Sequence, residues 1–392
     1  MVNADSLIAE FRRRFTGCEP SVLARAPGRV NLIGEHVDYN GGLVMPFAIH
    51  LATWAVVGRR EDQRVIAHSI QSRDVVELDS RRIGEPLKGW GAYVQGVITE
   101  LQKQGMPYCG MNILIDSDVP AGAGLSSSAA LESVVALAGL EIAGHSLSLK
   151  QIADACRNAE HKYARVPCGI MDQMASLFSR AEHIMLLDCR DETVDFVHWP
   201  SVDVALVIVD SRSPHELSSG TYALRVEECR NAQRHLTTND EVPADFRTVS
   251  LSRLEKFACQ MSDEITRRAR HVITEIARVR LAADALRQGD FQLLGSLMDS
   301  SHQSLAVDYE VSTPQMDALA SIIQSVDGVY GARLTGAGFG GCVVAVADRA
   351  AVPRIEAAVR REYDPIYGVI APVWTCRPSD GASVTRLERR MP

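Results

Sequence analysis

A segment near the start of the chain brings together side chains that could bind and polarise a hydroxylated ligand. Residues 28–42 read GRVNLIGEHVDYNGG, which sets Arg29, Glu35, His36 and Asp38 within ten residues of loop-like sequence. A carboxylate accepts hydrogen bonds from two hydroxyls at once, so Glu35 and Asp38 together suit a polyol. The guanidinium of Arg29 could fix an anion beside them. The alternative is a turn that carries solvated charges.

A second segment, residues 122–129, combines glycines and serines directly ahead of an apolar helical pattern; it reads GAGLSSSA. Glycines let the backbone approach a ligand, and the helix behind them adds unpaired N–H donors and the positive end of its dipole. We therefore predict that this junction holds phosphate. It is not a Walker A loop, because no Gly-Lys-Ser/Thr closes it. The alternative is a glycine turn before a serine-capped core helix.

Two further carboxylates could complete such a site. Glu160 lies on the next predicted helix and, with the hydroxyl of Ser128, offers the oxygen ligands that Mg²⁺ prefers. Taken alone, Glu160 would be a surface helix residue. Asp172 follows Cys168-Gly169-Ile170-Met171 in an apolar context, where a carboxylate is costly unless it is paired. Asp172 is therefore either a helix cap or a functional group.

Hydrophobic periodicity indicates the elements that must position these residues. In the first half we predict a helix over 4–15, strands over 21–26, 43–58 and 111–116, and helices over 128–143 and 149–163. In the second half we predict a strand over 204–209, helices over 221–236 and 263–287, and a strand over 342–346 that follows the glycine loop 335–341. Both halves indicate an α+β fold. We expect two domains, residues 1–199 and 200–392.

Composition limits the class of protein. The net charge of −8 argues against a nucleic-acid partner. Nine cysteines without a C-x-x-C pair indicate reduced thiols, and hence a cytoplasmic protein. No apolar run approaches the roughly 18–20 residues that a membrane span needs. The first residues are polar and amphipathic, unlike a signal peptide.

Four segments in one order resemble the motifs of a known family. Residues 26–46 (APGRVNLIGEHVDYNGGLVMP) closely resemble the galactokinase signature, and residues 119–129 (VPAGAGLSSSA) resemble the phosphate loop of GHMP kinases. Residues 168–173 (CGIMDQ) are similar to the galactokinase segment around its catalytic aspartate, and residues 334–342 (LTGAGFGGC) resemble the third GHMP motif. Val37 stands where the signature usually has Thr, and Ala121 and Ala123 loosen the glycine run. The chain is thus identified as a member of the galactokinase family.

The resemblance implies a two-domain GHMP-kinase fold. Each domain would be a mixed or antiparallel sheet packed with helices, with the active site in the cleft between them. The implied reaction is ATP-dependent phosphorylation of the C1 hydroxyl of D-galactose, the first step of the Leloir pathway. Alternatives are a related kinase for N-acetylgalactosamine, arabinose or mevalonate, or a sensor that binds galactose and ATP without catalysis. We expect a monomer whose partners are galactose and ATP, with no nucleic acid and no membrane.

The resemblance also assigns residues by position. Arg29 and Asp172 would flank the attacking hydroxyl, with Asp172 as a general base or as an electrostatic anchor. The residues that would line the sugar pocket are Glu35, His36, Asp38, Gly169 and Tyr222. The residues that would wrap the triphosphate are Gly122, Ala123, Gly124, Leu125, Ser126, Ser127 and Ser128. Ser128 and Glu160 would hold Mg²⁺. Trp90 and Tyr93 would lie near adenine; plain core packing is the alternative for that pair.

Overall fold

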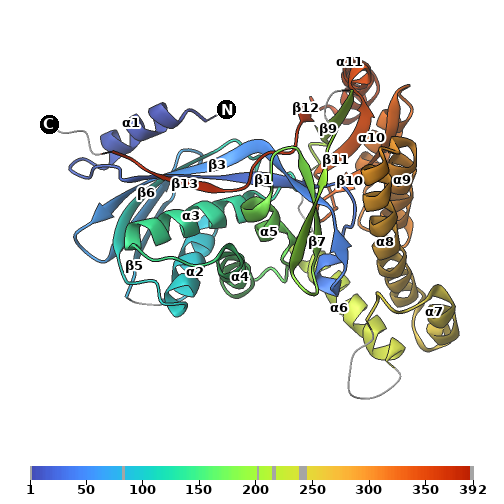
Figure 1. Ribbon diagram of the computed structural model, residues 1–392, viewed down its shortest axis with the longest axis horizontal. Coiled ribbons are helices and arrows are strands. Elements are labelled where there is room, and N and C mark those ends of the chain that lie inside the picture. The colour runs from blue at the N-terminus through green and yellow to red at the C-terminus, as the bar shows by residue number, and fades with distance from the viewer. Residues whose placement is uncertain (1, 82–83, 201–202, 214–217, 238–244, 389–392) are drawn as a thin grey trace.

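Three sheets packed by helices form the molecule, so the α+β class is confirmed (Figure 1). The computed structural model describes residues 2–81, 84–200, 203–213, 218–237 and 245–388. The first sheet lies in the N-terminal half, the second in the C-terminal half, and a small third sheet lies between them.

The first sheet has the strand order β13-β1-β3-β6-β4-β5, and all neighbours are antiparallel except β4 and β6. Its strands are β1 (Val22–Asn31), β3 (Pro46–Arg60), β4 (Arg64–Ser69), β5 (Val75–Asp79), β6 (Gly110–Ser117) and β13 (Ser383–Arg386). The helices of this half are α1 (Ala4–Arg14), α2 (Trp90–Lys103), α3 (Ser127–Ala143), α4 (Leu149–Ala159) and α5 (Met171–Phe178).

Helices cover both faces of the first sheet (Figure 1). On one face α3 packs against β1 and β3 and is flanked by α2, α4 and α5. Most of α3 is buried, as expected for a helix that is apolar all round. On the other face α1 lays Leu7 and Phe11, one helical turn apart, against Val56 and Leu114. The helix behind the predicted phosphate loop is therefore fixed in the core.

The second sheet is antiparallel throughout, in the order β10-β11-β9-β12. Its strands are β9 (Val204–Asp210), β10 (Val329–Thr335), β11 (Cys342–Asp348) and β12 (Val373–Cys376). Every residue of β9 is buried, as its continuous apolar run predicts. The helices of this half are α6 (Ser218–Leu236), α7 (Leu251–Phe257), α8 (Asp263–Gln288), α9 (Phe291–Val307), α10 (Pro314–Gln324), α11 (Val352–Ala358) and α12 (Asp364–Tyr367).

A three-stranded sheet joins the two halves. It consists of β2 (Leu43–Val44), β7 (His183–Asp188) and β8 (Thr193–His198), and α8 from the C-terminal half contacts both β2 and β8. The C-terminal strand β13 also crosses over and pairs with β1. Segments from both ends of the chain thus build the first sheet. The domain boundary near residue 199 stays a prediction.

Short turns of tighter or wider helix complete the fold. They are η1 (Asp38–Asn40), η3 (Ala258–Gln260) and η4 (Arg349–Ala351), which are 3₁₀, and η2 (Glu160–Ala164) and η5 (Val359–Tyr363), which are π-helical. The helix predicted over 149–163 is therefore wrong at its end, because the α-helical bonding of α4 gives way to η2 at Glu160. Such π-turns often occur at functional sites.

The first strand is longer than predicted. The Pro27-Gly28 pair suggests a turn, yet β1 continues to Asn31, because the pairing register with β3 shifts between Pro27 and Arg29. A bulge of this kind accommodates a proline within a strand. A Cβ at Gly28 would lie 2.6 Å from the carbonyl oxygen of Leu125, so the glycine lets β1 approach the phosphate loop. The bulge therefore brings two of the motifs together.

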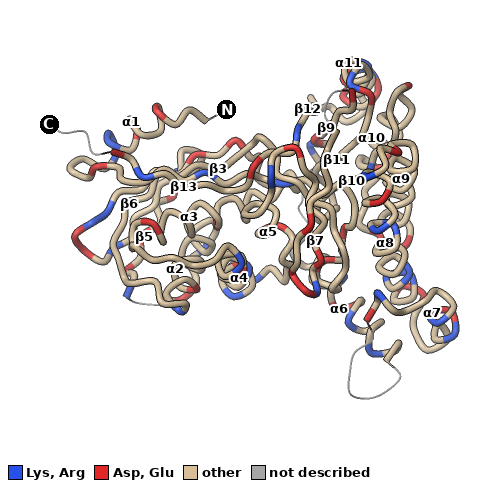
Figure 2. The backbone as a smooth tube through the Cα atoms, viewed as in Figure 1, with Lys and Arg blue, Asp and Glu red and all other residues tan. Residues whose placement is uncertain are grey.

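Charges of both signs are distributed over the described elements (Figure 2). Within the described ranges, no helix is both long enough and apolar enough to cross a membrane.

Candidate active site

A cavity of about 350 Å³ gathers residues from all four sequence motifs. It lies where the end of β1, the start of α3, the start of α5 and the end of β10 converge. The described residues that line it are Arg29, Glu35, His36, Asp38, Tyr93, Gly122, Gly124, Ser126, Ser127, Ser128, Glu160, Val166, Cys168, Met171, Asp172, Tyr222, Gly336 and Ala337.

Arg29 and Asp172 form an ion pair with two hydrogen bonds on one wall of this cleft. Arg29 Nε donates to Asp172 Oδ1 and Arg29 Nη2 to Asp172 Oδ2, each over 2.8 Å. The third guanidinium nitrogen, Nη1, donates to the carbonyl oxygen of Gly124 over 2.7 Å. Asp172 lies in the first turn of α5 but does not cap it, since Ile170 occupies the cap position. The carboxylate is directed at Arg29 instead.

The glycine loop has a backbone suited to an anion. Gly122 and Gly124 both have φ of 74° and Ser126 has φ of 58°, in alternation with residues of ordinary backbone conformation. Such alternation turns successive N–H groups toward one concave side. The side chain of Ser126, at the N-cap of α3, makes no capping bond and instead donates to Asp172 Oδ2 over 2.5 Å. The reading of a serine-capped core helix is therefore wrong, and the first-turn donors remain available.

Asp38 and Gly169 are in close contact beside the Arg29–Asp172 pair. Burial, and then the charge of Asp172, raise the pKa of Asp38 to about 7. A Cβ on Gly169 would overlap the carboxylate of Asp38, so only glycine fits there. Gly169 itself lines an adjoining cavity together with Asp38.

His36 is held in a left-handed backbone conformation, with φ of 61°. Its Nε2 lies 3.1 Å from the carbonyl oxygen of Ala337, and its Nδ1 lies 2.8 Å from the hydroxyl of Tyr39. Burial lowers the pKa of His36 to about 3, so the ring is neutral. Its Nε2 proton must then point at Ala337, since a carbonyl can only accept. The ring of Tyr222, whose pKa burial raises, lies 5.6 Å from that of His36.

Glu160 is buried at the start of η2 and lines the same cleft. Burial and the charge of Asp172 raise the pKa of Glu160, and hydrogen bonds from Cys168, Ser128 and Gln173 oppose that rise. Gln173 Nε2 donates to Glu160 over 2.8 Å and to Glu132, on α3, over 3.1 Å. Burial also raises the pKa of Glu132, whose Oε1 has no partner among the described atoms.

These oxygens fit a magnesium ion that is shared with a nucleotide. No group of three or more His, Cys, Asp and Glu side chains in the described part of the chain is placed to hold a metal by itself. Mg²⁺ usually takes one or two carboxylates and fills its remaining positions with phosphate and water. Glu160 and the hydroxyl of Ser128 supply such a partial set. A cation there would also offset the buried negative charge.

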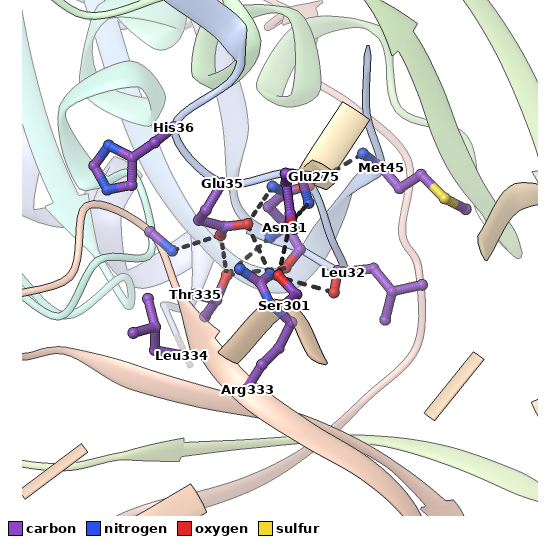
Figure 3. Close-up of polar contacts among 12 residues, drawn as sticks. Asn31, Leu32, Glu35, His36, Met45, Glu275, Ser301, Arg333, Leu334 and Thr335 are labelled. Carbon is purple, nitrogen blue, oxygen red and sulfur yellow. Dashed lines mark hydrogen bonds and ion pairs between the residues drawn. The ribbon is translucent and has the colours of Figure 1, made fainter. Parts of the chain in front are cut away.

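Glu35 is 1% exposed and is held by donors from both halves of the chain (Figure 3). Its Oε2 accepts from Arg333 Nη1 over 2.7 Å and from Asn31 Nδ2 over 2.5 Å. Its Oε1 accepts from Thr335 Oγ1 over 3.1 Å and from the backbone N–H of Gly336 over 2.8 Å. Glu35 therefore links the sugar signature to the third motif.

Four of the predicted site residues do not contribute to the described lining of the cleft: Trp90, Ala123, Leu125 and Gly169. The indole of Trp90 packs against the core, whereas Tyr93, three residues later, lines the cleft. Ala123 and Leu125 are buried within the glycine loop. Roles for these residues in binding stay predictions.

Sequence reasoning missed several residues of the site. Gly336 and Ala337 line the cleft, and Arg333 contacts Glu35, although the third motif carried no assigned role. The resemblance of residues 334–342 to that motif was the available signal. Nothing in the local sequence indicated that Glu132 lies beside Glu160.

Comparison with protein families places all these motifs in one group. The galactokinase galactose-binding signature matches residues 9–59. The N-terminal domain of GHMP kinases matches residues 92–180, and their C-terminal domain matches residues 282–365. The two-domain GHMP architecture is thus confirmed.

Individual relatives match over nearly the whole chain. A galactokinase from Roseiflexus sp. (strain RS-1) is 42% identical, covering 95% of this chain and 96% of the relative. The galactokinase of Homo sapiens is 39% identical, covering 97% of both chains. The crystal structure of Lactococcus lactis galactokinase complexed with galactose superimposes with a TM-score of 0.91 at 31% identity, over 97% of this chain and 99% of that one. Methanococcus jannaschii mevalonate kinase shares the fold, with a TM-score of 0.62 at 19% identity over 91% and 98%.

Proposed function

Because the chain belongs to the galactokinase family of GHMP kinases, we propose that it transfers the γ-phosphoryl group of ATP to the C1 hydroxyl of D-galactose. The observation that carries this proposal is the pairing of Arg29 with Asp172 at the mouth of the glycine loop. A carboxylate, a guanidinium and a row of backbone donors then face one cavity. Phosphoryl transfer depends mainly on positioning and on stabilising charge, which such a set can provide.

Asp172 would orient the attacking hydroxyl. Three of its lone-pair directions are taken by Arg29 and Ser126. A carboxylate has about four, so one remains for the C1 hydroxyl of the sugar. As the oxygen attacks, its proton would pass to Asp172. Arg29, fixed between Asp172 and the carbonyl oxygen of Gly124, would face the developing charge on the phosphoryl group.

The sugar would lie against the signature segment. We propose that Asp38 accepts hydrogen bonds from the sugar hydroxyls, with His36, Tyr222 and Gly169 shaping the pocket around it. A site built to bind a hydroxyl rejects an analogue that lacks it by about 10⁴–10⁵-fold. We propose that Glu35 lines the sugar pocket without a hydrogen bond to the sugar, because four protein donors occupy its two oxygens.

The triphosphate would lie along the loop from Gly122 to Ser128 and the first turn of α3. Ser128 and Glu160 would hold Mg²⁺, which when bound supplies charge neutralisation for the phosphates. The chain's own donors, the backbone N–H groups of the loop, would fix the orientation of the phosphates. We propose that Tyr93, which lines the cleft, lies near the adenine together with Trp90.

We also propose that the enzyme acts as a monomer in the cytoplasm. All nine cysteines are free thiols, as expected in a reducing compartment. Sedimentation equilibrium at several concentrations tests the oligomeric state, since a dimer would show twice the mass of the chain.

The test of the reaction is ADP release, coupled to a dehydrogenase readout. Galactose, glucose, N-acetylgalactosamine, arabinose and mevalonate are compared with Mg²⁺ and with a chelator. We expect turnover with galactose and Mg²⁺ and at least tenfold lower kcat/KM with each other substrate. Faster turnover with another sugar would assign a different kinase. Galactose binding without ADP release would indicate a sensor.

A further inference from the structure

Arg333 lies outside the predicted site residues, yet it contacts the segment that carries Glu35, His36 and Asp38. It is fully buried near the end of β10. Its Nη1 donates to Glu35 Oε2 over 2.7 Å and lies 3.3 Å from the carbonyl oxygens of both Asn31 and Leu32 (Figure 3). One guanidinium therefore contacts the signature segment, residues 31–38, both at backbone carbonyls and at a side chain.

The contact fixes the orientation of Glu35 rather than merely neutralising it. Thr335 and Gly336, two and three residues after Arg333, donate to the other oxygen of the same carboxylate. Three donors from one short segment thus define the position of a side chain in the other half of the chain. The residues directly after Glu35 are His36 and, two further on, Asp38, which both line the cleft.

A second buried carboxylate, that of Glu275, is also influenced by the charge of Arg333, although it pairs directly with Arg278, whose Nε donates to it over 2.7 Å. Glu275 on α8 accepts from the backbone N–H of Gly34 over 2.9 Å and from Ser301 Oγ over 2.6 Å. Burial alone would raise the pKa of Glu275, but the charges of Arg278, His271 and Arg333 hold it at about 2. In Figure 3 the side chains of Glu35 and Glu275, which come from different segments of the chain, lie near one another, and that of Arg333 lies below them. Removing Arg333 would leave the buried carboxylate of Glu35 without its ion-pair partner and would lower the positive charge around Glu275, which keeps its pair with Arg278.

The same end of β10 also touches the phosphate loop. Gly336 has φ of 88°, and a Cβ there would lie 2.8 Å from the carbonyl oxygen of Gly124. That oxygen accepts from Arg29, which pairs with Asp172. Contacts therefore run without a gap from Arg333, through Glu35 and Gly336, to the Arg29–Asp172 pair.

We propose that Arg333 is a positioning residue, which holds residues 31–38 in the geometry that binds galactose. This inference rests on the proposed function, because it concerns the same sugar pocket. Arg333 does not line the cleft; it acts through Glu35 and through the backbone of the signature segment. Its loss would therefore affect sugar binding more than nucleotide binding.

The test compares Arg333→Met with Arg268→Met. Arg268 is also a buried guanidinium of the C-terminal half, but its partners are Glu228, Glu310 and the carbonyl oxygen of Asp308. Isothermal titration gives the Kd for galactose and for a non-hydrolysable ATP analogue. For Arg333→Met we expect the galactose Kd to rise about 10- to 100-fold, and the nucleotide Kd to change by less than about threefold. For Arg268→Met we expect both constants to stay within about threefold.

Hydrogen exchange gives a second readout that needs no ligand. Amides of residues 31–45 should exchange at least about tenfold faster in Arg333→Met than in Arg268→Met, because their anchors are lost. If Arg333→Met does not fold, Arg333→Lys replaces it; that variant keeps the charge but loses the planar fork, so a smaller rise, about three- to tenfold, is expected.

The outcomes separate the two proposals. A galactose Kd within threefold of the wild type, unchanged exchange over residues 31–45, or an equal rise in both constants would overturn the positioning role. A wild-type protein that binds galactose but releases no ADP would overturn the proposed reaction and leave the positioning test intact. If the wild type does not bind galactose, the exchange measurement alone decides the role of Arg333.

Discussion

Replacing Asp172 by asparagine removes one charge from the cleft at nearly constant shape. The NH2 that replaces one carboxylate oxygen cannot accept a hydrogen bond, so Asp172→Asn breaks one of the two bonds from Arg29. It also removes the acceptor for the proton of the attacking hydroxyl. General-base assistance is worth about 10²–10⁴-fold in rate, or about 3–5 kcal/mol of barrier. We therefore expect kcat to fall at least a hundredfold.

The same substitution should change stability only slightly. It leaves Arg29, which is 4% exposed, without its counter-charge, and this destabilises the fold. Against this, the charge of Asp172 raises the pKa of both Asp38 and Glu160, so its removal relieves repulsion with two neighbours. Because the two effects oppose each other, we expect the melting temperature to shift by only about 2–6 °C.

The assay combines ADP release at saturating substrates with titration of galactose into the protein. Galactose should bind within about tenfold of the wild-type affinity, since Asp38 and its neighbours remain. Asp62→Asn is the matched control, because Asp62 also makes a two-bond pair with an arginine, Arg60, but outside the cleft. A kcat within tenfold of the wild type would refute the catalytic role. If the affinity for galactose fell by the same factor as kcat, Asp172 would instead be a binding residue.

Three further predictions concern neighbouring residues. Gly169→Ala should raise the galactose KM at least about tenfold and leave the ATP KM within threefold, because the new methyl displaces the carboxylate of Asp38; steady-state kinetics checks this, and equal rises would contradict it. Asp38→Asn should stabilise the ligand-free protein at pH 8 by up to about 4 kcal/mol. Folding raises the pKa of Asp38 to about 7, so the folded protein retains this proton between about pH 4 and 7, and wild-type stability falls as the pH rises through that window. Denaturant titrations of both proteins at pH 5 and pH 8 test this prediction. Equal stability of the two proteins at pH 8 would count against the raised pKa. Ser128→Ala should raise the Mg²⁺ concentration for half-maximal activity about 10- to 100-fold; an unchanged requirement would remove Ser128 from the metal site.

Local chemistry made the phosphate loop predictable from the sequence. Glycines, serines and an apolar helical pattern stand next to one another, and each signal concerns the same few residues. The structure agrees, with alternating positive φ at Gly122, Gly124 and Ser126 ahead of α3. The strand β9 was equally predictable, since an unbroken apolar run of its length is typical of a buried strand.

Long-range partners were not predictable in this way. Arg29 and Asp172 were each singled out for their residue type, but only the family resemblance joined them across 143 positions. Glu35 and Arg333 are 298 positions apart, and none of the sequence motifs predicts that they pair. Trp90 and Tyr93 show the limit of periodicity as well: a spacing of three places both on one side of a helix, yet Trp90 packs on the core and Tyr93 lines the cleft.

The balance of charge in the cleft explains why its two ligand sites belong together. Among the described residues that line the cavity, Glu35, Asp38, Glu160 and Asp172 accompany a single guanidinium, that of Arg29, and burial raises the pKa of Asp38 and Glu160. A bare triphosphate would add to this excess of negative charge, so backbone donors alone would not hold it there. A cation held by Ser128 and Glu160 would remove the conflict, because it would offset the charge of both the carboxylates and the phosphates. We therefore expect nucleotide binding to require a divalent cation, and we expect Asp38, whose neutral form burial favours, to lose its proton as sugar hydroxyls replace the missing solvent.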